Sequence, residues 1–317
     1  MPPAAETTAE EWVVVPFRVL KEHDGMRLDA YLALRLNKLS RAKVQKIIDE
    51  GRVTLRGRVP KAASRVADGE TLTIRYPRTE EPPVPHEVMP ILYQDDALVV
   101  INKPGGVLSH PTDKILHNTV TTILSRQLNA KVHLAHRLDR ETSGILVLAL
   151  NPDAARSMFE QFMGRTIRKE YLAIVFGDVQ WKKKTVDAPL GPEGGEIRVR
   201  QKVGEGQEAV TDFERLATDG KYSLVSAKPK TGRLHQIRAH LAHVGHPVVG
   251  DKLYVGAGEA YMKAVRREIA QDDLDALGAD RQLLHAWKIS FDHPKTGKRL
   301  NIEAPVPDDF PLKPEAM

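Results

Sequence analysis

The sequence predicts an α+β protein in two parts, a small basic module and a larger domain in which helices and strands are mixed. Five prolines between residues 77 and 90 exclude helix and sheet interiors there and predict an extended linker between the two parts. Before the linker, apolar residues follow a helical period and then form two short strand-like runs. After it, strand-like apolar runs and helical patterns are mixed over more than 200 residues.

Length and composition exclude several classes of protein. The chain has 317 residues, of which 41% are hydrophobic and 28% charged, as is usual for soluble globular proteins. Charges interrupt each apolar run before the roughly 20 residues of a membrane-spanning helix, and the acidic start is not typical of a secretory signal. The absence of cysteine excludes disulfides, thiolate zinc sites and cysteine nucleophiles. We expect a monomer in the reducing cytoplasm, with no membrane partner.

The first part of the chain divides into a tail and a folded module. Residues 1–17 are rich in Ala, Thr, Pro and Glu, which predicts a flexible tail. Residues 18–76 predict a compact unit in which two short helices are followed by a small sheet. Ser40 is a good N-terminal cap for the second helix, and Gly51 is placed to end it. The expected elements are helices over 27–37 and 41–50 and strands over 53–55 and 71–74.

The small module is strongly basic. Between residues 35 and 65 there are ten Arg or Lys residues and only two acidic ones, Asp49 and Glu50. Such an excess is typical of a surface that binds the phosphate backbone of a nucleic acid, although a solvated surface without a partner would have the same composition. The residues that we expect to contact the phosphates of a nucleic acid are Arg41, Lys43, Lys46, Arg52 and Arg56.

The larger domain is expected over residues 91–312, after the linker of residues 77–90. Asn151 and Pro152 are typical of a helix start. Residues 191–206 contain five glycines, which predicts a mobile loop or a hairpin arm. The expected strands cover residues 91–93, 97–101, 145–150, 171–176 and 222–227, and a charged helix-like stretch covers residues 259–282.

The strongest candidate site is the polar run 136–144, which leads directly into the apolar strand of residues 145–150. Polar residues at the mouth of a buried strand lie where a rigid element can hold reacting groups in a cleft. Asp139 lies between Arg137 and Arg140, whose charges favour the ionised carboxylate that a nucleophile requires. A turn in which the aspartate only contacts arginine would explain the same residues.

Three further segments carry candidate residues. Tyr171 begins a strand and could stack on a base, although packing against a neighbouring strand is the simpler explanation. Arg233 and His235 follow Gly232 before a helical stretch, where an arginine could bind a carboxylate or phosphate, or lie on a charged surface. Lys103 ends a strand and precedes a loop that could line a pocket or be a plain turn.

A metal site is the alternative use of the histidines in this region. His235, His240, His243 and His246 lie close together in the sequence, with Asp251 nearby. Their spacing does not match the His-Glu-x-x-His pattern of catalytic zinc sites, and the chain has no cysteine. We therefore expect no metal.

Several segments resemble the motifs of one enzyme family. HRLDRETSGILVLA (136–149), RKEYLAIV (168–175) and TGRLHQIRAHLAHVGHPVVGDKLY (231–254) resemble the three main motifs of the RluA-type pseudouridine synthases. Residues 284–294 are similar to the late signature of this family, and residues 27–57 are similar to an S4 RNA-binding domain. The resemblance extends over nearly all of residues 18–310.

The resemblance implies a fold and an activity. The fold would be an S4-type module joined to a catalytic domain with a mixed, mainly antiparallel central sheet flanked by helices and loops. The activity would be isomerisation of specific uridines to pseudouridine in structured RNA by base flipping and an aspartate nucleophile, with no cofactor. Asp139 would be the essential aspartate, Tyr171 the aromatic residue beside the target uracil, and Arg233 the arginine that pairs with the aspartate.

The remaining assignments concern substrate binding. By the same match, Arg137 would fill the gap left by the extruded base and Ile237 would line the base pocket. We add Lys103 and His235 as candidate substrate-binding residues. The family usually has Leu-Tyr-Gly after Gly-Asp, but here Val255 follows Tyr254, so this loop is expected to differ.

The sequence is compatible with more than one substrate, more than one class of protein and more than one reaction route. Large-subunit (23S) ribosomal RNA is favoured because S4 modules commonly accompany that branch of the family, and transfer RNA is the alternative. A non-catalytic RNA-binding factor in ribosome assembly and a metal-dependent hydrolase are the rival functions. Attack at uracil C6, attack at ribose C1′ and a glycal-like intermediate are all compatible with Asp139.

Overall fold

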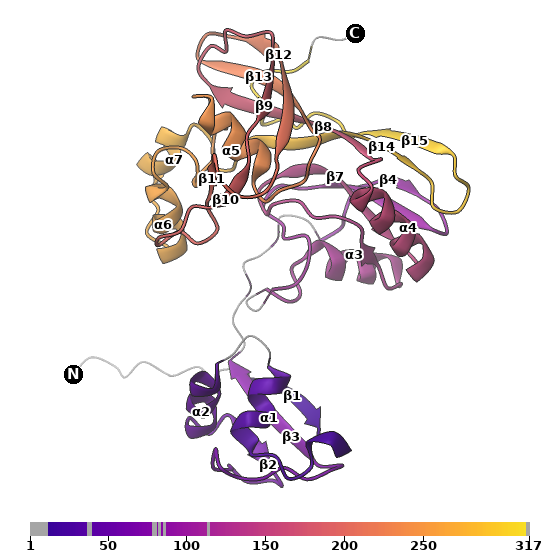
Figure 1. Ribbon diagram of the computed structural model, residues 1–317, viewed down its shortest axis with the longest axis vertical. Helices are drawn as coiled ribbons and strands as arrows, with labels where there is room; N and C mark the ends of the chain where they lie inside the picture. The colour runs from indigo at the N-terminus through magenta and orange to yellow at the C-terminus, as the bar shows by residue number, and fades with distance from the viewer. Residues whose placement is uncertain are drawn as a thin grey trace, which may run out of the picture. The chain divides into compact units, whose positions relative to one another are not determined.

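The computed structural model describes residues 12–36, 40–77, 81, 84, 87–112 and 115–314. The chain forms two compact units, residues 1–80 and residues 81–317. Both combine helices with β-sheet, which confirms the predicted α+β class (Figure 1). Residues 1–11 of the predicted tail and several residues of the predicted linker lie outside the described part of the chain. Among the described residues, no helix is long and apolar enough to cross a lipid bilayer.

The N-terminal unit contains a three-stranded antiparallel sheet in the order β1-β3-β2. Strand β1 (Trp12–Arg18) pairs with β3 (Thr71–Pro77), which also pairs with β2 (Val53–Leu55). Residues 12–17 thus belong to the sheet, and the prediction of a tail as far as residue 17 is wrong for them. Their run of valines favours a strand, and Pro16 is tolerated because β1 lies at the sheet edge.

Two helices complete the N-terminal unit, as the sequence predicts. Helix α1 (Leu28–Arg35) is followed by α2 (Arg41–Asp49), and the Ser40 hydroxyl accepts a hydrogen bond from the backbone of Lys43 at 3.4 Å. A short 3-10 helix (Lys21–His23) precedes α1. One core joins the helices to the strands through buried residues that include Leu28, Tyr31, Leu32, Val44, Ile48, Val53, Leu72 and Ile74.

A ten-stranded sheet forms the centre of the second unit. Eight strands follow the order β4-β5-β7-β14-β8-β13-β12-β9, while β15 pairs with β14 and β6 with β7. The β7–β14 pair is parallel and the other pairs are antiparallel, which agrees with the predicted mainly antiparallel sheet. The strands are β4 (Ile91–Gln94), β5 (Leu98–Lys103), β6 (His133–Leu134), β7 (Ser143–Ala149), β8 (Arg168–Phe176), β9 (Lys183–Asp187), β12 (Val210–Thr218), β13 (Tyr222–Pro229), β14 (Leu284–Asp292) and β15 (Arg299–Glu303).

Helices α4 (Pro152–Met163) and α5 (Gln236–His243) cover the same face of this sheet at two places. Met158 of α4 joins a core with β5 and β7, whereas α5 joins a core with β8 and β13. Tyr171 packs against both cores, so it lies on the sheet surface between the two helices. Its neighbour Leu172 points to the opposite face, as alternation along a strand requires.

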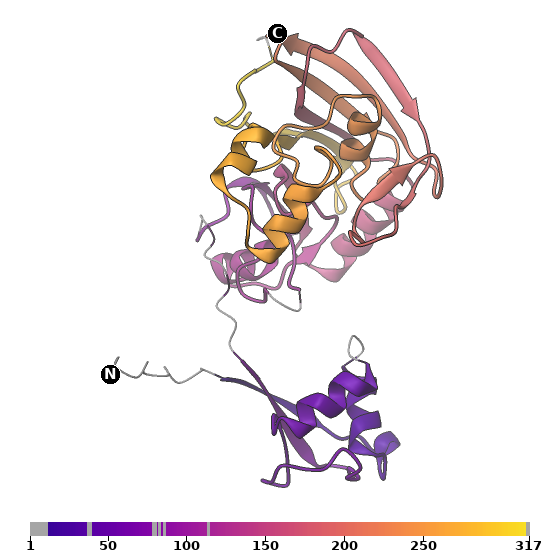
Figure 2. The ribbon, with the colours of Figure 1, turned by 90° about the vertical axis from the view of Figure 1, so that its left-hand side faces the viewer.

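Shorter elements surround the sheet. Helix α3 (Val120–Leu128) precedes β6, while α6 (Glu259–Arg266) and α7 (Gln271–Leu277) occupy the charged stretch that the sequence predicts to be helical. Residues 191–206 contain much of the two-stranded hairpin of β10 (Leu190–Pro192) and β11 (Gln201–Val203). Figures 1 and 2 show this hairpin close to α5 and α6, and α6 packs against it through Tyr261.

Candidate active site

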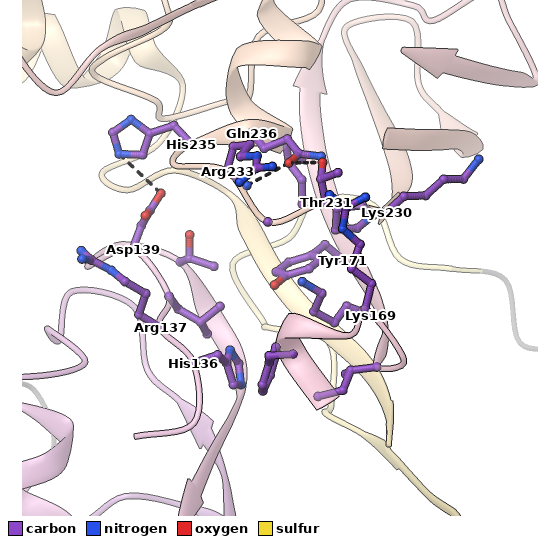
Figure 3. A pocket seen from close by; sticks show the side chains of 18 of the residues that line it. His136, Arg137, Asp139, Lys169, Tyr171, Lys230, Thr231, Arg233, His235 and Gln236 are labelled. Atoms are coloured by element: carbon purple, nitrogen blue, oxygen red, sulfur yellow. Dashed lines mark hydrogen bonds and ion pairs between the residues drawn. The ribbon is translucent and has the colours of Figure 1, made fainter. Parts of the chain in front are cut away.

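A cleft of about 540 Å³ lies on the sheet face between α4 and α5. Six Arg or Lys side chains line it, and Asp139 is the one carboxylate among the residues of its wall. In Figure 3, Asp139 and Arg137 lie on one side of the cleft and face Tyr171 and Lys169 on the other. An excess of positive charge in a concave site attracts a polyanionic ligand.

Asp139 is held by a buried arginine that the sequence analysis did not select. Nη1 of Arg238 donates to Oδ2 of Asp139 at 2.8 Å. Nε and Nη2 of Arg238 donate to the two carboxylate oxygens of Asp251 at 2.6 and 2.7 Å. Arg238 is 7% exposed and Asp251 is fully buried. The guanidinium thus links two carboxylates, and its planar geometry fixes the orientation of Asp139.

The position of Arg238 follows from the local sequence. Helix α5 begins at Gln236, whose side-chain oxygen accepts from the backbone of Arg233 at 2.9 Å and closes the preceding turn. Gly250 has φ +79°, and a Cβ atom there would lie 1.8 Å from the carbonyl oxygen of Arg281. Only glycine fits this turn, which brings Asp251 against the guanidinium of Arg238.

The prediction that Arg233 pairs with Asp139 is wrong. Nε of Arg233 donates to the backbone carbonyl of Glu208 at 2.9 Å, and the ion pair with Asp139 belongs to Arg238. Arg233 precedes α5 and is half-buried, whereas Arg238 lies within the helix and faces the protein interior. A charged residue between the apolar residues Ile237 and Ala239 is the sequence signal that points to it, because a buried arginine requires carboxylate partners.

Electrostatics keep Asp139 ionised and Tyr171 neutral. Burial raises the pKa of Asp139, but the charge of Arg238 and its hydrogen bond outweigh this, so the pKa lies below its usual value. Burial, together with the nearby charge of Asp139, raises the pKa of Tyr171. At neutral pH the cleft therefore presents one carboxylate and one protonated phenol.

Contacts just before and at the starts of β7 and β14 hold the loop that carries Asp139. The amide nitrogen of Gln282 donates to the Thr142 hydroxyl at 2.7 Å and lies 3.5 Å from Oδ2 of Asp139. Gly144 has φ +103°, and a Cβ atom there would lie 2.2 Å from the carbonyl oxygen of Ala286. Glycine thus allows β7 to approach β14 closely, five residues after the aspartate.

Lys103 has a different place from the one predicted. Its side chain is fully buried and does not line the cleft. The ammonium donates to the carbonyls of Pro104, Val107 and Arg140 at 2.8, 2.8 and 3.0 Å. Burial lowers the pKa of Lys103 to about 7. Its predicted contact with substrate is therefore corrected to a contact with the backbone beside Asp139.

Three other predicted residues line the same cleft. Nε2 of His235 lies 3.9 Å from Oδ2 of Asp139. Burial lowers the pKa of His235 to about 4, so its ring is neutral at physiological pH. Ile237 is 7% exposed and Arg137 is exposed, and both contribute to the wall. The structure brings these residues together with Asp139 and Tyr171, and their individual roles remain predictions.

Two histidines of this cluster, His240 and His246, make structural hydrogen bonds. Nδ1 of His240 lies 3.0 Å from the Thr211 hydroxyl, and Nδ1 of His246 lies 2.9 Å from the carbonyl of Phe176. Among the described residues, no group of three His, Asp or Glu side chains is placed to hold a metal ion.

The predicted phosphate contacts of the N-terminal unit fall into two groups. Lys43 and Lys46 are exposed on α2, with Nζ of Lys46 at 3.9 Å from a carboxylate oxygen of Glu50. The other three form closer ion pairs within the unit, Arg41 with Asp29 at 3.0 Å, Arg52 with Glu50 at 2.9 Å and Arg56 with Glu70 at 2.5 Å. The two lysines are therefore the more available partners for a phosphate.

Comparisons with known proteins agree with this site. The sequence model of the RNA pseudouridylate synthase family matches residues 97–243, which include Asp139, Tyr171 and Arg238. An RNA pseudouridine synthase of Bacillus subtilis strain 168 is 33% identical over 92% of this chain and 93% of its own length. The ribosomal large subunit pseudouridine synthase C of Yersinia pestis is 34% identical over 93% of this chain and 92% of its own length.

Solved structures of RNA pseudouridylate synthase domains are also similar to this chain. Human RNA pseudouridylate synthase domain containing 1 is 28% identical, with a TM-score of 0.57 over 71% of this chain and 86% of that one. Human RNA pseudouridylate synthase domain containing 4 is 29% identical, with a TM-score of 0.53 over 69% of this chain and 89% of that one. The extent of these matches, together with the cleft around Asp139, shows that the chain belongs to the RluA-type RNA pseudouridine synthases.

Proposed function

We propose that this protein isomerises specific uridines of large-subunit ribosomal RNA to pseudouridine, acting as a monomer in the cytoplasm. The observation that carries the proposal is the ionised Asp139, held by Arg238 in a basic cleft beside Tyr171. Relatives whose names specify the large ribosomal subunit, from Yersinia pestis and Xanthomonas campestris, favour ribosomal RNA over transfer RNA. An ionised carboxylate held in this way disfavours a catalytically inactive RNA-binding scaffold.

The reaction is an isomerisation within one nucleotide. The bond from uracil N1 to ribose C1′ breaks, the base turns, and a new bond forms from C5 to C1′. The proton on C5 is lost and N1 gains a proton, so no oxidant, reductant or group donor is consumed. The protein has to supply access to the base, a nucleophile or base, and a surface on which the detached uracil turns.

Access requires that the uridine leave its stack, because the reacting atoms cannot be reached inside a structured RNA. Arg137 is exposed at the cleft, two residues before Asp139, and its guanidinium is free to fill the position that the base vacates. Ile237 contributes an apolar wall against which the extruded uracil packs.

Asp139 performs the covalent chemistry. As the one carboxylate of the cleft wall, it adds to uracil C6 or to ribose C1′, or removes a ribose proton on the way to a glycal. Each of these routes begins from the same ionised oxygen, which Arg238 orients. Tyr171 keeps its proton because burial raises its pKa, so it acts as a neutral phenol beside the uracil and not as a phenolate base.

The N-terminal unit contributes affinity for RNA in this proposal. Its exposed Lys43 and Lys46 would make phosphate contacts that carry charge but little sequence information. The similarity of residues 27–57 to an S4 RNA-binding domain supports this role.

The proposal is tested by mapping pseudouridines in total RNA from a deletion strain of the source organism. The strain is complemented with the wild-type gene or with Asp139→Asn. We expect at least one pseudouridine in large-subunit ribosomal RNA to disappear and to return only with the wild type. A lost site in transfer RNA alone would correct the substrate, and an unchanged pattern in all RNAs would refute the function.

A further inference from the structure

The outer end of the catalytic cleft carries an exposed apolar surface on α4. Phe159 is 61% exposed and Met163 is 68% exposed, and both line the cleft that contains Asp139. They are four residues apart, so they lie on one face of the helix. Between them in sequence, Phe162 is half-buried and packs against the ring of His136 at 4.8 Å between centroids. Phe159 and Met163 thus face solvent at the mouth of the site.

A cation without an acidic partner lies beside this surface. Nζ of Lys169 is 5.8 Å from the centre of the Phe162 ring, and no carboxylate of the described residues lies within ion-pair distance of it. Lys169 lies on the same face of β8 as Tyr171, and Figure 3 shows the two side chains next to each other. Burial lowers the pKa of Lys169, so an anion bound there would stabilise its charged form.

With these residues, the wall of the cleft extends beyond the part that would hold one uracil. Along its wall, Asp139 faces Tyr171, and Lys169 lies beside Tyr171. The Phe162 ring near Lys169 belongs to α4, which also contributes Phe159 and Met163 to the wall. Two adjoining nucleotides of an RNA strand present matching groups in the same order, namely a base, a phosphate and a second base. Aromatic and thioether side chains offer a surface for stacking, and an unpaired ammonium matches a phosphate. The excess of cations in the wall favours this polyanion over an apolar protein segment.

We propose that Phe159 and Met163 form a platform for the base adjoining the target uridine, and that Lys169 contacts the phosphate between the two nucleotides. The inference rests on the proposed function and adds a second nucleotide subsite to it. Stacking on Phe159 would select RNA in which the neighbouring base is also unpaired. The target is then a uridine in a loop or a bulge, next to a base that is free to leave its own stack.

The test uses single-turnover kinetics on a ribosomal RNA hairpin that spans the mapped uridine. We expect Phe159→Ala to raise the RNA concentration for half-maximal rate at least about fivefold, as the loss of a stacked base requires. Phe159→Tyr should restore the wild-type value, because the ring is retained. Val265→Ala is the matched control, since Val265 is 60% exposed on α6 and does not line the cleft.

A second measurement reports stacking directly. The hairpin carries 2-aminopurine on the 5′ or the 3′ side of the uridine, and we expect its fluorescence to differ between complexes with wild type and with Phe159→Ala at one of these positions. Equal kinetics and equal fluorescence of the two proteins on both hairpins would overturn the platform while leaving the proposed function intact. A wild-type protein that forms no pseudouridine in any ribosomal RNA would refute the proposed function and this inference with it.

Discussion

Replacing Arg238 by lysine should impair catalysis far more than the same change at Arg233. Arg238 donates through three nitrogens to two carboxylates, at 2.6, 2.7 and 2.8 Å. A lysine ammonium is a single point on a flexible chain and cannot reproduce this planar arrangement. The Arg233 side chain instead donates to the backbone carbonyl of Glu208 at 2.9 Å, and it does not pair with Asp139.

The size of the effect follows from the hydrogen bond between Arg238 and Asp139. A hydrogen bond to a charged group contributes about 1.5–3 kcal/mol, which corresponds to a factor of about 10 to 150 in rate if the bond orients Asp139 for reaction. Arg238→Lys should therefore reduce the single-turnover rate at saturating RNA by about this factor. Arg233→Lys should stay within about threefold of wild type, since an exposed hydrogen bond to one carbonyl contributes little.

The assay follows release of tritium from C5 of labelled uridine, because the reaction removes the proton from that carbon. Thermal unfolding of both variants serves as the control, since Arg238 also joins Asp251 in the core. A further variant, Asp251→Asn, removes the second carboxylate and should slow the same step. If Arg233→Lys slows the reaction as much as Arg238→Lys, the assignment of Arg238 as the partner that orients Asp139 is refuted.

Three further predictions concern the rest of the molecule. Lys103→Met should lower the unfolding free energy by about 1–3 kcal/mol, measured in urea, because three backbone carbonyls lose their buried donor. Unchanged stability would contradict its structural role. Stability should also fall as pH drops below about 6.5, by about 1.4 kcal/mol per pH unit for each histidine that is buried neutral, since the unfolded chain then binds more protons than the folded one. The histidines concerned are His136, His235 and His285, whose pKa values burial lowers to about 3, about 4 and about 4. A urea midpoint of unfolding that stays constant from pH 8 to pH 5 would contradict this prediction. Neutralising Lys43 and Lys46 together should weaken the dependence of RNA affinity on salt. The slope of log affinity against log salt should fall by about 0.7 for each phosphate of single-stranded RNA that no longer pairs with a lysine, while the rate at saturating RNA changes little. An unchanged slope would exclude both lysines as phosphate ligands.

Local patterns predicted most of the fold. Caps at Ser40 and Asn151 placed the starts of α2 and α4, because their side chains satisfy free backbone donors. The start of the N-terminal sheet was not predicted, since a single strand such as β1 is stable only through its pairing with another strand, here β3, which lies more than 50 residues later. Such long-range pairing is not visible in a short window of sequence.

The site was predicted as a set of segments, but not as a set of contacts. The motifs identified the loop of Asp139, the strand of Tyr171 and the start of α5 as parts of one site. The arginine that reaches Asp139 is determined by where α5 begins and by which face of this helix is buried. Helix α5 begins at Gln236, so Arg238 lies within it and contacts Asp139, whereas Arg233 precedes it. Lys103 was misplaced for a similar reason, because its three acceptors are backbone carbonyls that no sequence pattern reveals.

Asp139 is the centre of this account, and a substitution that keeps its shape tests it most directly. Purified wild type and Asp139→Asn are compared for RNA affinity, thermal unfolding and release of C5 tritium at saturating RNA. The asparagine retains an oxygen for Arg238 but has no negative charge, so we expect similar affinity, a retained fold and no measurable turnover. Pseudouridine formation by Asp139→Asn at a rate near that of wild type would contradict the account.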